Sequence, residues 1–414
     1  MVTIKDYKVK PTTKIVDDLA IQIMYIPLTS KLGYSYEPVV KPGDYVGIGT
    51  VIGKNKIAEI PLMSSVSGTV VGFEDKYISN GKLVSCLVIE NDFKEKYQDK
   101  SGKVKNITKY SKDEFIYLLK KCAITGMSGS SFPTYIKYDT KNKIKYLIVD
   151  GAECEIYASA DSARMYKNPE EILECIDAIM EIMQIEKAYI AINEQNELII
   201  NKFLKYINSY PNIKIYSLIN AYPNGYERYL VNEILGLTYD KLPIEVGVIN
   251  ENISTIYAIY EALKYHKPLT ERIVTISGNG INKPANYNLK IGTNFNEILL
   301  KTNIQKAINN PLIIAGGAMM GTSIPSDELI ITADTNCILI MEDKKEITTD
   351  CIKCGKCSEV CPMNLIPSLI IDNPKQKKEL RIDKCINCGL CSYVCPSKIE
   401  VRELIKKIKE GKNE

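Results

Sequence analysis

Two short runs of the sequence share one spacing of cysteines. Residues 350–362 read DCIKCGKCSEVCP, and residues 384–396 read KCINCGLCSYVCP. Each run contains the pattern C-x2-C-x2-C-x3-C-P. The two runs hold eight of the thirteen cysteines of a 414-residue chain, so this part of the chain is specialised for thiolate chemistry.

The spacing predicts two [4Fe–4S] clusters, because three close thiolates can hold one face of a cube while the fourth binds the cube of the other run. We expect one cluster at Cys351, Cys354, Cys357 and Cys395, and the other at Cys385, Cys388, Cys391 and Cys361. Zinc is the alternative, but zinc sites more often use two cysteine pairs separated by a longer loop. The doubled pattern therefore favours iron–sulfur clusters. Clusters relay single electrons, so the other residues are expected to supply or receive them.

The bulk composition indicates a globular protein of two to four domains, with 45% hydrophobic and 25% charged residues. A net charge of +3 does not indicate a nucleic-acid partner. The sequence contains no apolar stretch long enough to cross a bilayer, and its first residues lack the apolar core of a signal peptide. We therefore expect a cytoplasmic protein without direct membrane insertion, which could still dock at the inner face of the cell membrane.

The periodicity of apolar residues changes along the remaining sequence. Residues 37–75 alternate short apolar runs with the turn signals KPGD and SGT, which predicts short strands. They resemble the flattened β-sandwich of lipoyl and biotinyl carrier domains, but lack the motif that carries the modified lysine. From about residue 110, expected helices (111–124, 168–185) alternate with strands (145–151, 187–193, 213–219). This alternation predicts an α/β domain with a mostly parallel sheet, whose ligands bind beyond the carboxyl ends of the strands.

Several motifs occur in an order that resembles one family. They are GMSGSSFPTYIKY (126–138), VDGAECEIYASAD (149–161), AYPNGYERYL (221–230), GVINENISTIYAI (247–259), SGNGINKPANY (277–287), GGAMMG (316–321) and the two cysteine runs. This order resembles the RnfC-like family: the C subunit of the Rnf ferredoxin–NAD oxidoreductase complex and its soluble relatives, especially the electron-transfer protein associated with clostridial proline reductase. It also resembles, more distantly, the NADH-binding flavoprotein subunit of respiratory complex I.

The resemblance implies a multidomain α/β fold with four parts. Residues 1–100 are expected to form the lipoyl-like β-sandwich, a barrel-sandwich hybrid. Residues 105–267 are expected to form the α/β domain that binds FMN and NADH. An SLBB domain of the β-grasp type is expected at residues 268–342, and a two-cluster ferredoxin-type domain at residues 343–414.

The resemblance also implies cofactor-binding residues but no catalytic acid, base or nucleophile. The expected FMN- and NADH-binding residues are Gly126, Gly129, Ser130, Phe132, Thr134, Lys137, Asp150, Glu153, Glu155, Glu227, Asn252, Ser254 and Thr255. Two glycines of the family's first loop are serines here, Ser128 and Ser131. A Cβ at either position is expected to narrow the approach of a ligand.

The sequence leaves three functions open. In the first, electrons pass from NADH through FMN and both clusters to a partner reductase, which the resemblance suggests is proline reductase. In the second, the chain is the peripheral NAD-binding C subunit beside the Rnf membrane subunits. In the third, which the two serines motivate, the chain is a flavin-free electron wire.

Overall fold

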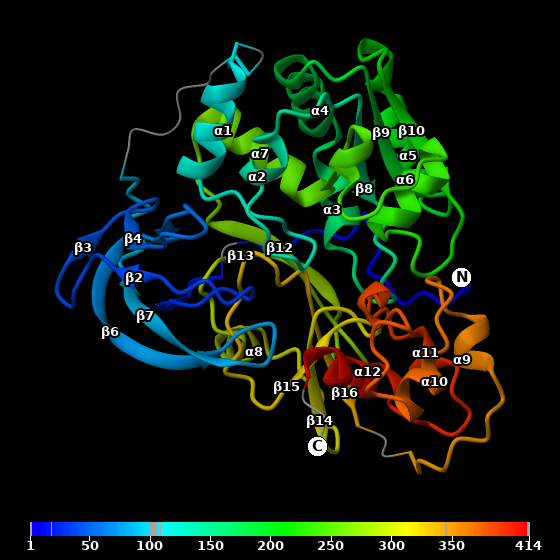
Figure 1. Ribbon diagram of the computed structural model, residues 1–414. Coiled ribbons are helices and arrows are strands. Elements are labelled where there is room, and N and C mark those ends of the chain that lie inside the picture. The colour runs from blue at the N-terminus through cyan, green and yellow to red at the C-terminus, as the bar shows by residue number, and fades with distance from the viewer. Residues whose placement is uncertain (1, 18, 99–105, 108, 344–345, 412–414) are drawn as a thin grey trace.

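The computed structural model describes residues 2–17, 19–98, 106–107, 109–343 and 346–411. The domain limits expected at residues 1, 100, 105 and 414 lie outside the described residues. The described residues form four sheets, and Figure 1 shows them gathered around a common centre, with the region of the two cysteine runs at the lower right.

The first part is a β-sandwich, as predicted. One sheet has the order β1 (Ile23–Pro27), β7 (Leu83–Asn91), β6 (Gly68–Tyr77) and β3 (Tyr45–Val46); the other joins β2 (Glu37–Pro38), β4 (Val51–Lys54) and β5 (Leu62–Met63). Apolar side chains from both sheets share one core, among them Met24, Ile52 and Leu87. Buried and exposed positions alternate along these strands, as the sequence pattern predicted.

The second part is an α/β domain with a fully parallel sheet. Its strand order is β10 (Ile213–Leu218), β9 (Lys187–Asn193), β8 (Tyr146–Gly151) and β11 (Val248–Asn252). Its helices are α1 (Lys112–Lys121), α2 (Tyr135–Tyr138), α3 (Ala160–Lys167), α4 (Pro169–Met183), α5 (Glu197–Leu204), α6 (Glu227–Leu235) and α7 (Ile253–Tyr265), with the 3-10 turns η1 (Ile207–Ser209) and η2 (Pro243–Val246).

The sequence explains the local structure of this domain. Ser111 caps α1 in a capping box with Glu114, and Pro169 opens α4. Helices α1, α4 and α7 pack on one face of the sheet, while α6 packs on the other. The chain order reverses between β8 and β11, and such a switch point is where open parallel sheets bind ligands.

The third part is a mixed sheet with one helix. Its order is β13 (Ala285–Lys290), β12 (Glu271–Ser277), β16 (Cys337–Glu342), β14 (Pro311–Ala315) and β15 (Thr322–Ile324), and α8 (Phe295–Thr302) packs against it. The C-terminal part consists of short helices: α9 (Lys356–Glu359), α10 (Pro367–Asp372), η3 (Ile382–Lys384), α11 (Leu390–Tyr393) and α12 (Val401–Glu410).

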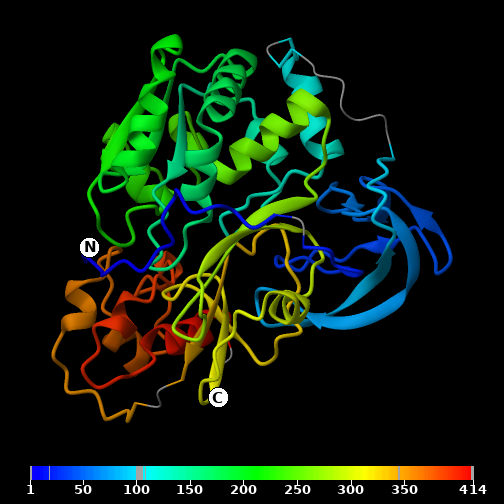
Figure 2. The ribbon, with the colours of Figure 1, turned by 180° about the vertical axis from the view of Figure 1, so that it is seen from behind.

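The N-terminal segment, residues 2–17, runs behind three of these parts. Val2 pairs with Tyr222 in the α/β domain, and the Val16 N–H donates to the Asn286 carbonyl on β13 at 2.8 Å. Figure 2 shows this segment crossing the molecule between the α/β domain above and the mixed sheet and cluster region below. It therefore ties together domains that are far apart in the sequence.

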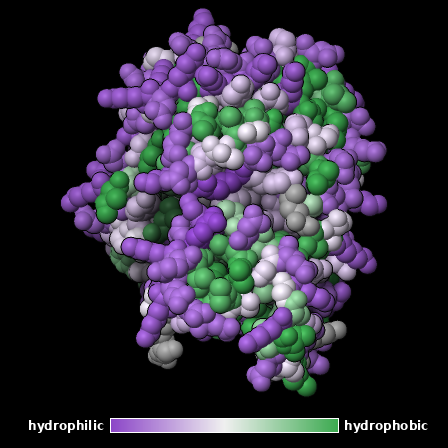
Figure 3. Space-filling model, turned by 45° about the vertical axis from the view of Figure 1, so that its right-hand side comes forward, coloured by the Kyte–Doolittle hydropathy of each residue, from purple (hydrophilic) through white to green (hydrophobic). Residues whose placement is uncertain are grey.

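The surface is largely hydrophilic on the face that Figure 3 shows, with hydrophobic side chains in separate patches. Among the described residues, none of the helices combines the length and apolar character needed to cross a membrane.

Candidate functional site

A cavity of about 730 Å³ lies where all four parts of the chain meet. Its wall comes from the loop at 126–137, the turn at 150–161, the start of α7 and the loop at 315–322. Lys31 and Ser79 of the sandwich and Ile386 of the cluster region complete it. Sites for cofactors typically enclose about 300–1,000 Å³, so the cavity has the size of a nucleotide-binding site.

The structure brings together most of the expected cofactor-binding residues. Those that line the cavity are Gly126, Gly129, Ser130, Phe132, Lys137, Asp150, Glu153, Glu155, Glu227, Asn252 and Thr255. Thr134 and Ser254 lie outside this lining. Thr134 is fully buried at the start of α2, and the buried Ser254 donates its hydroxyl hydrogen bond to Asp161.

The acidic turn after β8 uses its carboxylates to hold the protein in shape. Glu153 accepts hydrogen bonds from the N–H groups of Asp161 (2.8 Å) and Ser162 (3.1 Å) at the start of α3. Glu155 accepts from the N–H groups of Met319 (3.0 Å) and Met320 (2.8 Å). Both carboxylates therefore position the turn and the loop that face the cavity.

The loop at 126–137 is fixed to α7 by a short chain of hydrogen bonds. The Met127 N–H donates to the Thr255 hydroxyl at 3.0 Å, and Asn252 caps α7 by accepting from the N–H groups of Ser254 and Thr255. The Asn252 side-chain amide donates to Asp161 at 2.7 Å. The buried Asp161 thus links the start of α7 to α3, so Ser254 and Thr255 act as supports for the loop.

Two acceptors at the end of β11 have no partner within the described part of the chain. They are the Asn250 Oδ1 and Glu251 Oε1 atoms, both buried. The second Glu251 oxygen pairs with the Lys137 ammonium at 3.1 Å, and Lys137 also donates to the Asn250 carbonyl at 2.7 Å. Unsatisfied buried acceptors are unfavourable, so a ligand that brings N–H or O–H donors fits this wall.

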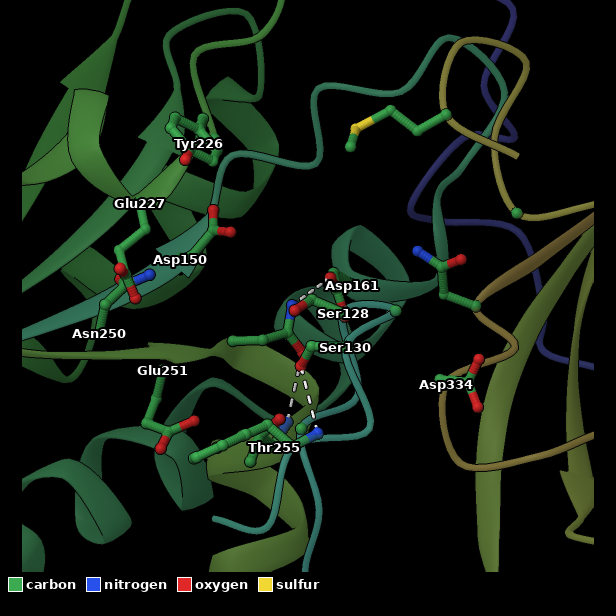
Figure 4. A pocket seen from close by; sticks show the side chains of 18 of the residues that line it. Ser128, Ser130, Asp150, Asp161, Tyr226, Glu227, Asn250, Glu251, Thr255 and Asp334 are labelled. Atoms are coloured by element: carbon green, nitrogen blue, oxygen red, sulfur yellow. Dashed lines mark hydrogen bonds between the residues drawn. The ribbon is translucent and has the colours of Figure 1, made fainter. Parts of the chain in front are cut away.

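The close-up in Figure 4 shows Asp150, Glu227, Asn250 and Glu251 on one side of the cavity and Asp334 on the opposite side. Sequence reasoning missed Asn250, Glu251 and Asp334. The first two lie within β11, where two adjacent polar residues in a buried strand were the available signal. No local signal marked Asp334, because it lies in the loop between β15 and β16 of another domain.

The expectation that both serines narrow the approach of a ligand is wrong for Ser131. Its side chain lies outside the lining and donates to Asp334 Oδ1 at 2.9 Å, with the backbone at a φ of 51°. Ser128 does line the cavity, so it alone narrows the approach. The serine at 131 therefore fixes the loop to the mixed sheet, and half of the argument for a flavin-free chain is removed.

Burial, together with the nearby carboxylates of Asp161 and Glu227, raises the pKa of Asp150 to about 7. The carboxylate faces the cavity and accepts from the Ala152 N–H at 3.0 Å. The folded state therefore binds a proton here more tightly than the unfolded chain does. The resulting stability is complete below about pH 4 and is lost as the pH rises towards 7.

We expect Asp150→Asn to remove this dependence, because the amide keeps the acceptor for Ala152 but carries no charge. Relative to the wild type, the variant should gain about 1–2 kcal/mol between pH 5.5 and pH 8, a figure reduced for the water that reaches the cavity. Urea unfolding at both pH values measures the gain. Asp113→Asn, at an exposed carboxylate on α1, is the matched control. Parallel pH profiles for wild type and Asp150→Asn would contradict the assignment.

The two cysteine runs are arranged unequally. Cys361, Cys385, Cys388 and Cys391 line a second, small cavity, which is the set of four predicted for one cluster. Cys388 is buried, whereas Cys351 and Cys354 of the other predicted set are exposed. Ile386 lines both this thiol-lined cavity and the large cavity. The inner set of thiols therefore lies against the candidate cofactor site, and the outer set reaches the surface.

The loop at 316–321 connects the acidic turn to the cluster region. Glu155 holds it from one side, while Arg402 of α12 donates to the carbonyls of Met320 (2.8 Å) and Gly321 (3.1 Å) from the other. Beside it, the Tyr222 hydroxyl donates to the Cys388 carbonyl at 2.7 Å. The position of the inner thiols relative to the large cavity is thus set by hydrogen bonds from three domains.

The scattered cysteines take no part in this arrangement, with one exception. Cys86, Cys122, Cys175 and Cys337 are buried. Cys154 lines the large cavity, and burial raises the pKa of its thiol to about 12. Cys154 is therefore a neutral thiol rather than a nucleophile.

Comparison with protein families gives three matches along the chain. Residues 2–94 match the RnfC barrel sandwich hybrid domain, residues 119–261 the Nuo51 FMN-binding domain and residues 350–399 a 4Fe-4S dicluster domain. The last two support FMN and [4Fe–4S] clusters as cofactors. The size of the large cavity, its unpaired acceptors and the thiol-lined cavity fit these groups.

Curated relatives extend over most of the chain. The C subunit of the proton-translocating ferredoxin:NAD(+) oxidoreductase complex of Clostridium ljungdahlii is 31% identical over 84% of this chain and 77% of its own length. The C subunit of the Na(+)-translocating complex of Acetobacterium woodii is 29% identical over 84% of this chain and 80% of its own length. For the C subunit of an ion-translocating oxidoreductase complex of Haemophilus influenzae, 29% identical over 83% of this chain, the match covers 54% of the relative.

A solved structure shares the fold at lower similarity. A chain of the NAD+-reducing [NiFe]-hydrogenase in its H2-reduced state has a TM-score of 0.50 and 12% identity, with 73% of this chain and 61% of that chain covered. The curated relatives show the family, and the fold agrees with it. The chain belongs to the RnfC family, the C subunits of ion-translocating ferredoxin:NAD(+) oxidoreductase complexes.

Proposed function

We propose that this chain is the subunit that exchanges electrons with NAD(H) and passes them to a protein partner through two clusters. The observation that supports this proposal most directly is the position of Ile386, which lines both the large cavity and the small cavity of the inner thiols. The names of the relatives, which are ferredoxin:NAD(+) oxidoreductase subunits, support NAD(H) as one redox partner.

Bound FMN supplies the conversion between hydride transfer, which moves two electrons, and the single-electron chemistry of iron–sulfur clusters. The chain's own residues bind and orient. Asn250 and Glu251 present free acceptors, Lys137 holds Glu251 in place, and the loop at 126–137 closes one wall. Neither binding nor orienting the cofactor requires a protein nucleophile.

The order of the two clusters follows from their exposure. We assign the inner cluster to Cys361, Cys385, Cys388 and Cys391, and the outer cluster to Cys351, Cys354, Cys357 and Cys395. Exposed thiols at Cys351 and Cys354 put the outer cluster within reach of another protein. Domain limits near residues 100, 267 and 342 are part of the same proposal, since they separate the sandwich, the α/β domain, the mixed sheet and the cluster domain.

The partner protein is the finer part of the proposal. The relatives' names favour the membrane subunits of an Rnf complex, with this chain docked peripherally at the membrane. Proline reductase is the second candidate, because Ser128 and Ser131 depart from the family loop as a divergent, soluble relative would. Anaerobic co-purification with an affinity tag on this chain distinguishes the two candidates by the proteins recovered.

Anaerobic mixing with NADH tests the proposed activity. The full chain, purified without oxygen, is expected to contain one FMN and about eight irons. NADH should bleach the flavin absorbance first and the cluster absorbance afterwards. A chain that holds FMN but shows no bleaching would exclude NADH as the donor. A reconstituted chain that holds iron but never FMN would instead establish the flavin-free wire.

A further inference from the structure

The sandwich domain contributes a cation to the wall of the large cavity. Lys31 lies at the tip of the loop between β1 and β2 and is about one third exposed. The loop is held in place, because the Ser30 N–H donates to the Tyr34 carbonyl and the Asn80 side-chain amide donates to the Lys31 carbonyl. The lysine is therefore presented by an ordered turn.

The charges in the lining are unevenly distributed. Seven carboxylates line the cavity, at Asp150, Glu153, Glu155, Asp161, Glu227, Glu251 and Asp334, against two lysines, at Lys31 and Lys137. Lys137 is already bonded to the Asn250 carbonyl and paired with Glu251. An anionic group therefore finds an available cation only near Lys31.

Backbone donors lie beside this cation. The N–H groups of Ser128, Gly129 and Ser130 have no acceptor among the residues that the structure describes, whereas the neighbouring N–H groups of Met127 and Ser131 are bonded. Gly129 has a φ of +99°, and a Cβ placed on it would lie 4.0 Å from the Lys31 ammonium. Successive free N–H groups around a glycine with positive φ form a nest for anions.

Asp334 sets the position of Lys31 without using up its donors. The carboxylate lies 3.4 Å from the ammonium and accepts from the hydroxyls of Ser79, Ser131 (2.9 Å) and Thr332 (2.8 Å). The ammonium makes no hydrogen bond within the described ranges of the chain. One buried carboxylate thus joins the sandwich, the loop at 126–137 and the mixed sheet.

We propose that Lys31, with the N–H groups of Ser128, Gly129 and Ser130, binds a phosphate group of the ligand in the large cavity. This inference rests on the proposed function and adds the sandwich domain to the nucleotide site. The phosphate belongs either to the FMN ester or to the pyrophosphate of the dinucleotide. Both present the same chemistry, namely phosphate oxygens that accept charge-assisted hydrogen bonds.

Binding to the flavin-stripped full chain tests the inference with three probes: FMN, riboflavin and ADP-ribose. Riboflavin lacks the phosphate, and ADP-ribose carries the pyrophosphate but cannot be oxidised by hydride loss. Lys31→Gln is expected to lower the affinity for FMN or ADP-ribose about 10-fold and to leave the affinity for riboflavin unchanged. A loss confined to FMN identifies its ester, and a loss confined to ADP-ribose identifies the pyrophosphate.

Lys31→Arg should recover most of the affinity, because it keeps the charge. Lys41→Gln, at an exposed lysine of the same domain, is the matched control and should bind all probes as the wild type does. The inference is overturned if Lys31→Gln binds all probes normally, or if it weakens riboflavin as much as FMN. Because these readouts are affinities, they stay interpretable even if NADH does not reduce the wild-type chain.

Discussion

Replacing Cys388 with serine is expected to slow electron transfer beyond the flavin while leaving reduction by NADH intact. Cys388 is one of the four inner thiols, and its backbone carbonyl accepts the hydrogen bond from Tyr222. A serine hydroxyl is a poor iron ligand, so iron should fall from about eight to about four per chain. Stopped-flow absorbance under anaerobic conditions should show normal flavin bleaching and slow reduction of the remaining cluster.

Cys351→Ser is the matched variant at the outer set. It should lose the same amount of iron, but the remaining inner cluster should still be reduced as fast as in the wild type. The asymmetry arises because only the inner thiols share a wall with the large cavity. Electron paramagnetic resonance after rapid freezing distinguishes the two clusters. Equal rates of cluster reduction in the two variants would show that the order inner-then-outer is wrong.

Replacing Glu155 with alanine is expected to destabilise the junction between the large cavity and the inner thiols. The carboxylate accepts from two N–H groups, those of Met319 and Met320, and it packs so closely on Gly317 that a Cβ there would collide with it. Removal leaves two donors without their charged acceptor and opens a void beside the glycine. We expect a loss of about 2–3 kcal/mol in the free energy of unfolding.

The same change should slow reduction of the clusters more than reduction of the flavin. The loop at 316–321 also carries the carbonyls that accept from Arg402, so its displacement alters the position of the cluster region. Glu155→Gln keeps one acceptor oxygen and should fall between the wild type and Glu155→Ala in both measurements. If alanine leaves stability and both rates unchanged, Glu155 does not support this junction.

Local spacing determined what could be predicted from the sequence. The cysteine runs and the acidic turn after β8 are each encoded within a dozen residues, so they could be read directly. The parallel sheet followed from the alternation of strands and helices. The expected function of the acidic turn was less secure, because Glu153 and Glu155 bind backbone N–H groups of the protein itself.

The far wall of the cavity could not be predicted in this way. Lys31 and Asp334 are about three hundred residues apart in the sequence and meet at 3.4 Å only because the sandwich packs against the mixed sheet. Neither lies in a motif or stands out in its own segment. The position of the Ser131 side chain could not be predicted for the same reason, because its hydrogen-bond partner, Asp334, belongs to another domain.

The segment at residues 2–17 has a consequence for how the chain is made. Val2 leaves the ribosome more than two hundred residues before its pairing partner Tyr222. At about 5–20 residues per second, this segment waits roughly 10–40 s before it can dock. These residues therefore reach their native position long after they are synthesised, and docking of the segment is expected to be a late step in the maturation of the chain.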